Sequence, residues 1–227
     1  MGSMMISPGI QSVIFDFDYT LADSSEGVIE CANYALGRLG LPAASDDAIR
    51  HTIGLSLPNT LTALAGDEYA GHGEEFMRIF LDMAEKMMPD ATAILDFVPS
   101  LADTLLGHGM TLGIVSSGRR CRISRVLRRE GLDGQFKVIV GVEDVETPKP
   151  DPSGLLRAVD ALNTSKERCL YVGDSVTDAE TALRAGVRFV AALSGVTERE
   201  EFAEYEPVMV LGSAGELPAM LDAKVDH

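Results

Sequence analysis

Apolar residues follow two rhythms along the chain, one typical of buried strands and the other of amphipathic helices. The short run Val13-Ile14-Phe15 ends at Asp16, which predicts a buried strand with carboxylates at its C-terminal end. From about residue 99 onward, short apolar runs alternate with helical patterns. We predict strands at residues 111–115, 137–140, 169–172, 188–192 and 208–211, and helices near residues 121–129, 152–162, 177–185 and 213–221. Such alternation predicts a doubly wound α/β fold, in which helices cover both faces of a parallel sheet.

A purely helical stretch interrupts this alternation directly after the first strand. A helix is predicted from Ser24 or Ser25 to Gly40, because its apolar residues recur at steps of three and four. Further helices are predicted near residues 46–53, 58–65 and 74–88. We therefore expect a discontinuous core, residues 4–22 and 90–227, with an inserted all-helical domain, residues 23–89. The insert leaves the core at the carboxyl end of the first strand, which is the edge where open α/β sheets bind ligands.

Composition and charge narrow the classes of partner. The 227 residues are 46% apolar and 24% charged, which suits a globular core, and 19 basic against 35 acidic residues give a net charge of −16. That charge excludes general binding to nucleic acid. No apolar run approaches the roughly 20 residues that span a bilayer, so we expect no membrane partner and a cytoplasmic protein. The three cysteines form no CxxC pair, which excludes a disulfide framework and a zinc site.

Residues that carry chemistry occur in four separate clusters, each at the end of a predicted strand. The clusters are Asp16-Phe17-Asp18-Tyr19-Thr20, Ser116-Ser117-Gly118, Pro148-Lys149-Pro150 and the segment from Gly173 to Asp178. Because the carboxyl ends of parallel strands meet at one edge, we expect the clusters to converge there.

The converging side chains suit phosphoryl transfer. Four carboxylates, those of Asp16, Asp18, Asp174 and Asp178, repel one another unless a hard cation lies between them, and magnesium (Mg2+) is the natural partner for oxygen ligands. Lys149 and the Ser116 hydroxyl can donate to a phosphoryl group. The backbone of Ser117 and Gly118, at a helix N-terminus, can do the same.

Together these clusters resemble the haloacid dehalogenase-like (HAD) hydrolase superfamily, and within it the phosphoglycolate phosphatase-like phosphatases with a helical cap. The resemblance extends from Val13 to Leu221. It includes Asp16-Phe17-Asp18-Tyr19-Thr20-Leu21, Asp23-Ser24, Ile53-Gly54-Leu55, Ile114-Val115-Ser116, Lys149-Pro150-Asp151-Pro152, and Gly173-Asp174 with Asp178. Each cluster alone is weak, but four in the family's order are specific.

The resemblance implies a magnesium-dependent phosphatase that acts on a small phosphorylated metabolite, with phosphoglycolate as the first guess. Asp16 would be the nucleophile that forms an aspartyl-phosphate, and Asp18 the general acid and base. Ser116 and Lys149 would bind the transferring phosphoryl oxygens.

The resemblance also implies the metal ligands. Asp16, the main-chain carbonyl of Asp18, and Asp174 would hold Mg2+. Asp178 would lie in its outer shell or orient Lys149.

Several residues are candidates for substrate specificity. Tyr19 stands where the family usually has glycine, so the turn loses conformational freedom and gains bulk. Gly54 and Leu55 lie in a loop of the cap that could reach the core. Arg119 and Arg120 lie next to the predicted phosphate loop and could touch substrate. The other arginines of this stretch, Arg122, Arg125, Arg128 and Arg129, are expected on a solvated helix face.

Three alternatives stay open. An inorganic pyrophosphatase or a sugar-phosphate mutase could share this fold. A non-catalytic phospho-acceptor module could combine the same residue types, although such receivers have about half this length and lack an acidic residue two positions after the acceptor. The sequence does not distinguish a monomer from a homodimer.

Overall fold

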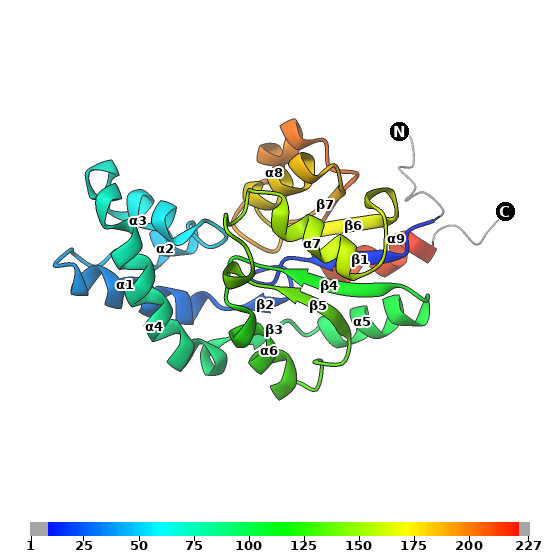
Figure 1. Cartoon of the computed structure of the whole chain (residues 1–227), viewed down its shortest axis with the longest axis horizontal. Coiled ribbons are helices and arrows are strands. Elements are labelled where there is room, and N and C mark those ends of the chain that lie inside the picture. The colour runs from blue at the N-terminus through cyan, green and yellow to red at the C-terminus, as the bar shows by residue number, and fades with distance from the viewer. Residues whose placement is uncertain (1–8, 223–227) are drawn as a thin grey trace.

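The computed structural model describes residues 9–222, and its core is a six-stranded parallel sheet (Figure 1). The strands lie in the order β5-β4-β1-β6-β7-β8. Their bounds are β1 (Ser12–Phe15), β4 (Thr111–Val115), β5 (Phe136–Val140), β6 (Cys169–Gly173), β7 (Arg188–Ala192) and β8 (Met209–Leu211). The predicted doubly wound α/β core is confirmed, and the bounds of its strands are within one residue of those predicted. Residues 4–8 and 223–227 of the predicted core lie outside the described residues.

Helices cover both faces of the sheet. One face packs against α5 (Val98–Gly107), α6 (Arg120–Arg129) and α9 (Leu217–Asp222), and the other against α7 (Ser153–Ala161) and α8 (Val176–Ala185). Short 3₁₀ segments complete the connections: η2 (Val142–Asp144), η3 (Lys166–Arg168), η4 (Arg199–Tyr205) and η5 (Ala214–Glu216). Helix α5 is absent from the predicted elements, although its buried residues follow the helical period. Its Pro99 lies in the first turn, where proline is compatible with a helix.

The strand register brings the chemistry-bearing residues to one edge. Phe15, the last residue of β1, pairs with Ile114 of β4 on one side and Val172 of β6 on the other. The next residue, Asp16, donates its backbone N–H to the Val172 carbonyl at 2.8 Å. The residues that follow β1, β4 and β6 therefore begin side by side.

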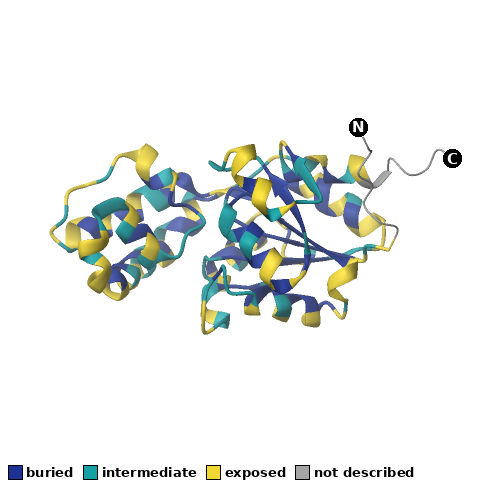
Figure 2. Ribbon diagram, turned by 90° about the horizontal axis from the view of Figure 1, so that it is seen from above, coloured by how far each residue is buried: buried dark blue, intermediate teal, exposed yellow. Residues whose placement is uncertain are grey.

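The inserted residues form a separate helical lobe, the cap. It contains α1 (Ser25–Arg38), α2 (Asp46–Arg50), α3 (Leu57–Ala65), η1 (Asp67–His72) and α4 (Gly73–Ala91). Leu36, Leu61 and Phe76 are buried in its own apolar cluster, and Figure 2 shows two lobes, each with a buried interior. The two segments that join the lobes pair as a small antiparallel sheet, β2 (Ala22–Asp23) with β3 (Ala93–Ile94). The predicted cap, residues 23–89, stays our proposal for the domain, with the last turn of α4 continuing to Ala91. No helix among residues 9–222 is long and apolar enough to cross a membrane.

One predicted cap helix is shorter than expected. The helix predicted over residues 46–53 ends at Arg50, and residues 51–54 form turns instead. Gly54 within them has φ of 98°, a left-handed conformation that glycine adopts without steric cost. These turns direct residues 52–57 toward the core.

Arginines at and after the start of α6 contact the cap helix α4, although Arg125, Arg128 and Arg129 are exposed, as expected for a solvated helix face. Arg119 forms an ion pair with Glu85 of α4 at 3.1 Å. Arg129 donates to the backbone carbonyls of Pro89 at 2.5 Å and Thr92 at 2.6 Å, where α4 ends. The carbonyls at a helix C-terminus lack partners within the helix, and cationic donors stabilise them.

Replacing Arg129 with alanine should loosen the junction between cap and core. We expect the free energy of unfolding to fall by about 1 kcal/mol, because two charge-assisted hydrogen bonds are lost at a partly exposed site. Hydrogen exchange should accelerate in residues 88–92. The control is Arg128→Ala, since that side chain is 75% exposed. Equal effects of the two substitutions would contradict this role for Arg129.

Candidate active site

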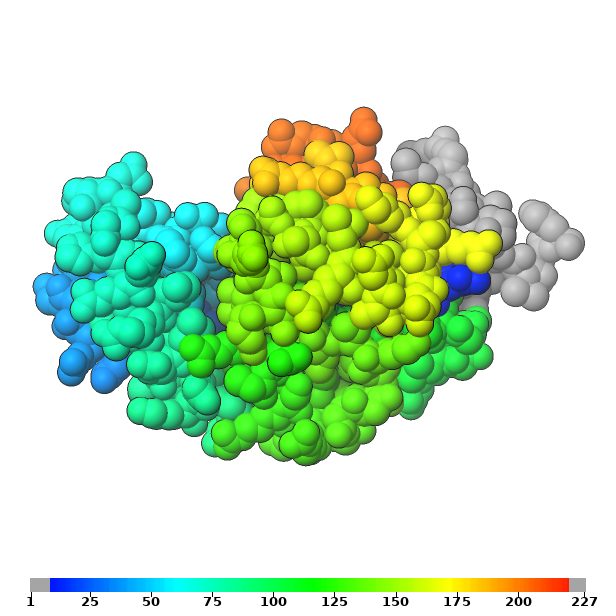
Figure 3. Space-filling view, in the orientation of Figure 1, coloured from blue at the N-terminus to red at the C-terminus, as the bar shows by residue number. Residues whose placement is uncertain are grey.

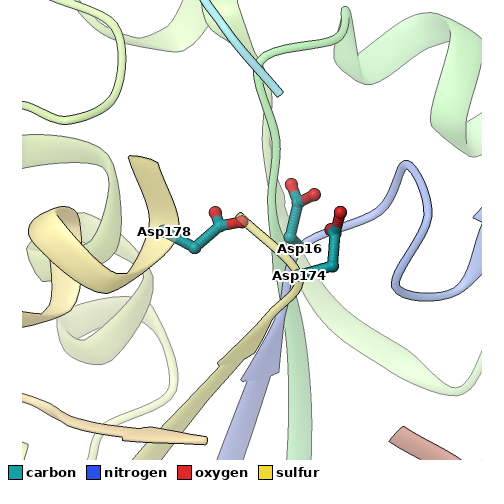
Figure 4. Close-up of side chains that lie close together, drawn as sticks. All are labelled: Asp16, Asp174 and Asp178. Carbon is teal, nitrogen blue, oxygen red and sulfur yellow. The ribbon is translucent and has the colours of Figure 1, made fainter. Parts of the chain in front are cut away.

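The carboxylates of Asp16, Asp174 and Asp178 converge at the carboxyl edge of the sheet (Figure 4). Asp16 follows β1, Asp174 follows β6, and Asp178 lies in the first turn of α8. One oxygen from each carboxylate lies within 4.8 Å of the others, and all three residues are buried. The three carboxylates are thus placed as the ligand sets of small hard cations are.

The surroundings of the Asp174 carboxylate also suit a divalent cation at this cluster. Thr20 donates to one oxygen of Asp174 at 2.9 Å, which fixes that carboxylate. Gly195 lies against the other oxygen, and a Cβ at position 195 would collide with it. The absence of a side chain at position 195 therefore keeps the space beside Asp174 open.

The pKa values of the cluster show how strongly it needs positive charge. Burial raises the pKa of Asp16 to about 7. The charge of Lys149 lowers this pKa, while the charges of Asp178 and Asp18 raise it further. Burial and the charges of Asp16 and Asp178 raise the pKa of Asp174 well above its ordinary value. A cation bound among these groups would stabilise their ionised forms.

Lys149 lies at the centre of a buried hydrogen-bond network. Its Nζ donates to Asp16 Oδ1 and to Asp178 Oδ1, each at 2.7 Å, and lies 3.3 Å from the hydroxyl of Tyr171. Burial on its own would lower the pKa of Lys149, but the charges of Asp16 and Asp178 raise it well above its ordinary value. The lysine is therefore a fixed cation.

Asp178 is held by its own helix terminus as well as by Lys149. A capping box forms at the start of α8, in which Ser175 Oγ accepts from the Asp178 N–H and Asp178 Oδ2 accepts from the Ser175 N–H, each at 3.2 Å. The Tyr171 hydroxyl donates to Asp178 Oδ1 at 2.7 Å. Asp178 therefore holds Lys149 in place through their 2.7 Å contact, and its alternative role in the outer shell of a metal stays a prediction.

The predicted phosphate loop lies between β4 and α6. Ser116 is buried, and its Oγ accepts a hydrogen bond from the Gly118 N–H at 3.0 Å. The hydroxyl oxygen of Ser117 is buried and has no hydrogen-bond partner among the described residues. An unpaired buried hydroxyl is costly, and it suits a site whose partner arrives with the substrate.

Asp18 lies apart from the three converging carboxylates and forms an ion pair that the sequence prediction missed. Arg122 donates from Nη1 to Asp18 Oδ1 at 2.9 Å and from Nη2 to Oδ2 at 2.6 Å. The Arg122 side chain is only 5% exposed, so its predicted place on a solvated helix face is wrong. Burial alone would raise the pKa of Asp18, but Arg122 lowers it below its ordinary value.

Tyr19 adopts a left-handed backbone conformation, which non-glycine residues rarely adopt. Its φ is 62°, its ring is buried, and its backbone N–H donates to the Ala22 carbonyl at 2.7 Å. Burial raises the pKa of its hydroxyl, against a hydrogen bond with Arg50 of the cap. Tyr19 thus joins the core turn to the cap.

The predicted cap loop reaches the core. A Cβ at Gly54 would lie 3.2 Å from Ser175 Cβ, next to Asp174 in the chain. Gly54, Leu55 and Arg119 also line a pocket of about 170 Å³ between the two lobes. Figure 3 shows the blue-to-cyan cap in contact with the green core around this region.

The pocket has an apolar wall and a charged floor. The cap supplies mainly apolar side chains, among them Leu57, Phe80 and Met88, while the core supplies Asp18 and Arg122. Its volume is below the roughly 300 Å³ at the lower end for sites of drug-sized ligands, so it suits a small metabolite.

Two missed residues had identifiable sequence patterns. Arg122 lies four positions before Val126, on the same helix face as the buried Ile123 and Val126, so the helical period places it toward the core. Tyr171 is the polar-tipped residue in the fully buried strand β6, and a buried phenol needs a partner. The role of Gly195 depends on a loop that no local pattern places.

Comparisons with known proteins agree with this geometry. A model of the haloacid dehalogenase-like hydrolase family matches residues 13–192. The chain is 30% identical to phosphoglycolate phosphatase 1 of Pseudomonas aeruginosa, over 90% of this chain and 77% of that protein. It is 28% identical to pyrophosphatase PpaX of Listeria monocytogenes, over 93% of this chain and 96% of that protein.

Solved structures agree as well. A Bacteroides fragilis protein assigned to the haloacid dehalogenase-like hydrolases superimposes with a TM-score of 0.87 and 38% sequence identity, covering 92% of this chain and 99% of that one. The family match spans both the core and the cap insertion. The chain belongs to the haloacid dehalogenase-like hydrolase family.

Proposed function

We propose that the protein is a magnesium-dependent phosphatase that hydrolyses a small phosphomonoester through an aspartyl-phosphate on Asp16. The observation that carries this proposal is the buried contact between Asp16 and Lys149 within a cluster of three carboxylates, with Ser116 lining the same small cavity as Lys149. Two related proteins named phosphoglycolate phosphatase and pyrophosphatase support phosphate chemistry. A cytoplasmic monomer or homodimer stays a prediction.

Residues of the chain would position the phosphoryl group for attack. Lys149 and the hydroxyl of Ser116 would bind its oxygens, together with the backbone of Ser117 and Gly118. The Asp16 carboxylate would attack phosphorus, forming an oxygen–phosphorus bond as the ester bond breaks. Bound Mg2+ would be held by Asp16, the Asp18 carbonyl and Asp174, and would neutralise charge on the phosphoryl oxygens.

Asp18 would serve both halves of the cycle. In the first half Asp18, released from Arg122 and protonated, would give a proton to the departing alkoxide, and in the second it would take a proton from the water that attacks the aspartyl-phosphate. The products are an alcohol and inorganic phosphate, and Asp16 and Asp18 return to their starting states.

A second candidate is an inorganic pyrophosphatase, favoured by the similarity to the Listeria monocytogenes enzyme. A sugar-phosphate mutase would retain its bisphosphate during turnover, so stoichiometric release of free phosphate would exclude it. A panel of phosphomonoesters and pyrophosphate, assayed with Mg2+ for phosphate release, distinguishes these candidates.

Removal of the metal should abolish turnover and lower thermal stability. The buried, mutually repelling carboxylates need a shared counter-charge, so Mg2+ should restore activity after chelation and raise the melting temperature. Asp174→Asn should lose most of the thermal response. Full activity in excess chelator would contradict the metal assignment.

Asp16→Asn should lower kcat by at least about a thousandfold, because an amide of similar shape cannot attack phosphorus. Circular dichroism should show an intact fold. The matched control is Asp151→Asn, an aspartate that precedes α7, accepts from the Ser153 N–H and lies outside the carboxylate cluster, and this variant should keep nearly normal activity. If Asp16→Asn retained a tenth of the wild-type rate, the nucleophile would have to be reassigned.

Asp18→Asn should trap the intermediate when the leaving group needs no proton. With Mg2+ and an activated aryl phosphate, we expect the intact mass to rise by one phosphoryl group, since the first step proceeds while hydrolysis is slow. The wild type should show far less adduct. An adduct that persists in the double variant with Asp16→Asn would show that another residue is the acceptor.

A further inference from the structure

Arg122 and Lys149 are the buried cations among the described residues, and they occupy different parts of the site. Lys149 contacts Asp16 and Asp178 in the carboxylate cluster. Arg122 pairs with Asp18, and both residues line the pocket between cap and core. The proposed phosphoryl site thus has its own cation, and Arg122 is a second cation within the pocket.

The guanidinium of Arg122 is fixed by its surroundings. It lies over the ring of Phe17, with Cζ 5.5 Å from the ring centroid. Gly118 lies on another side, and a Cβ at position 118 would collide with Nη2 of Arg122. Glycine at 118 therefore makes room for the guanidinium, besides any role in the phosphate loop.

Arg122 differs from the other arginines that line the pocket. Arg119 and Arg125 pair with Glu85 and Asp90 of α4, and those acidic side chains are 60% and 75% exposed. Solvent screens such pairs strongly. Arg122 is 5% exposed and makes a bidentate pair, so its charge acts at close range on any group that enters the pocket.

The charge balance of the site implies that binding of a substrate anion in the pocket between cap and core depends on Arg122. Four carboxylates, those of Asp16, Asp18, Asp174 and Asp178, face two cations, Lys149 and Arg122. One divalent cation balances this charge. The phosphoryl group of the substrate already adds negative charge to this balance, so a second negative group needs a direct cationic partner. Arg122 can be that partner if it exchanges Asp18 for the group.

We propose, on the basis of the proposed function, that Arg122 determines specificity by binding a second anionic group of the substrate, a carboxylate or a second phosphate. The guanidinium carries five N–H donors, and its fork matches either anion. When that group binds, it replaces Asp18 as the partner of Arg122. The Asp18 carboxylate is then free to approach the reacting oxygen. Phosphoglycolate and pyrophosphate share this chemistry, because each has an anion next to the scissile phosphoryl group.

The test compares phosphoglycolate with ethyl phosphate, in which a methyl group replaces the carboxylate, and adds pyrophosphate as the phosphate counterpart. The measured quantity is the ratio of kcat/KM for phosphoglycolate or pyrophosphate, which carry a second anionic group, to kcat/KM for ethyl phosphate, in the presence of Mg2+. Differences in leaving-group reactivity cancel when the ratio of a variant is compared with that of the wild type.

Arg122→Gln should reduce this ratio by roughly 10- to 100-fold, the effect of losing a charge-assisted pair at a specificity site. Loss of the ratio for phosphoglycolate alone assigns the second anion as a carboxylate, and loss for pyrophosphate alone assigns it as a phosphate. Arg125→Gln, on the same helix and lining the same pocket, should change the ratio by less than about threefold. Arg122→Lys keeps the charge without the planar fork and should give an intermediate ratio, which also serves if the glutamine variant does not fold.

An equal loss on all substrates in Arg122→Gln would overturn the inference, since it would show that Arg122 acts only by positioning Asp18. A wild-type ratio close to one would overturn it as well. Neither of these two results would contradict the proposed phosphatase activity. Absence of phosphate release by the wild type from all three compounds would overturn the proposed function, and with it this inference.

Discussion

The repulsion among buried carboxylates is the constraint on which the rest of the site depends. Asp16, Asp174 and Asp178 lie within 4.8 Å of one another and are screened from water, so they cannot all be ionised without positive charge between them. Lys149 supplies one such charge through contacts of 2.7 Å to Asp16 and Asp178. The cluster still requires further positive charge, and a divalent cation, which can also bind a phosphoryl group, would supply it.

The fold places the charged residues of the site through the positions of its backbone elements. Parallel register places the residues that follow β1, β4 and β6 next to one another, so Asp16, Ser116 and Asp174 need no long side chain to meet. The capping box of α8 fixes Asp178, and the hydroxyl of Tyr171 completes its contacts. The cap then closes the open side with Gly54 and Leu55, which leaves a pocket whose core floor contains Arg122.

The sequence predicts the core and the convergence of the carboxylates well, because both depend on local patterns. Period-two and period-3.6 apolar runs define the strands and helices, and Asp16 and Asp174 directly follow strand ends. Lys149 lies farther along the chain, beyond β5 and η2. Contacts that depend on tertiary packing were harder to predict. Arg122 appears in an arginine-rich stretch whose composition suggests solvent exposure, yet its position on the apolar face of α6 decides its burial.

The central claim is that phosphoryl transfer proceeds through Asp16 in two successive in-line displacements. The stereochemical course at phosphorus tests it most directly, using a phosphomonoester made chiral with three oxygen isotopes and a suitable phosphoryl acceptor alcohol. Each in-line displacement inverts the configuration, so two of them give overall retention. Retention is the result that this account predicts, and inversion would show direct attack on the substrate and contradict it.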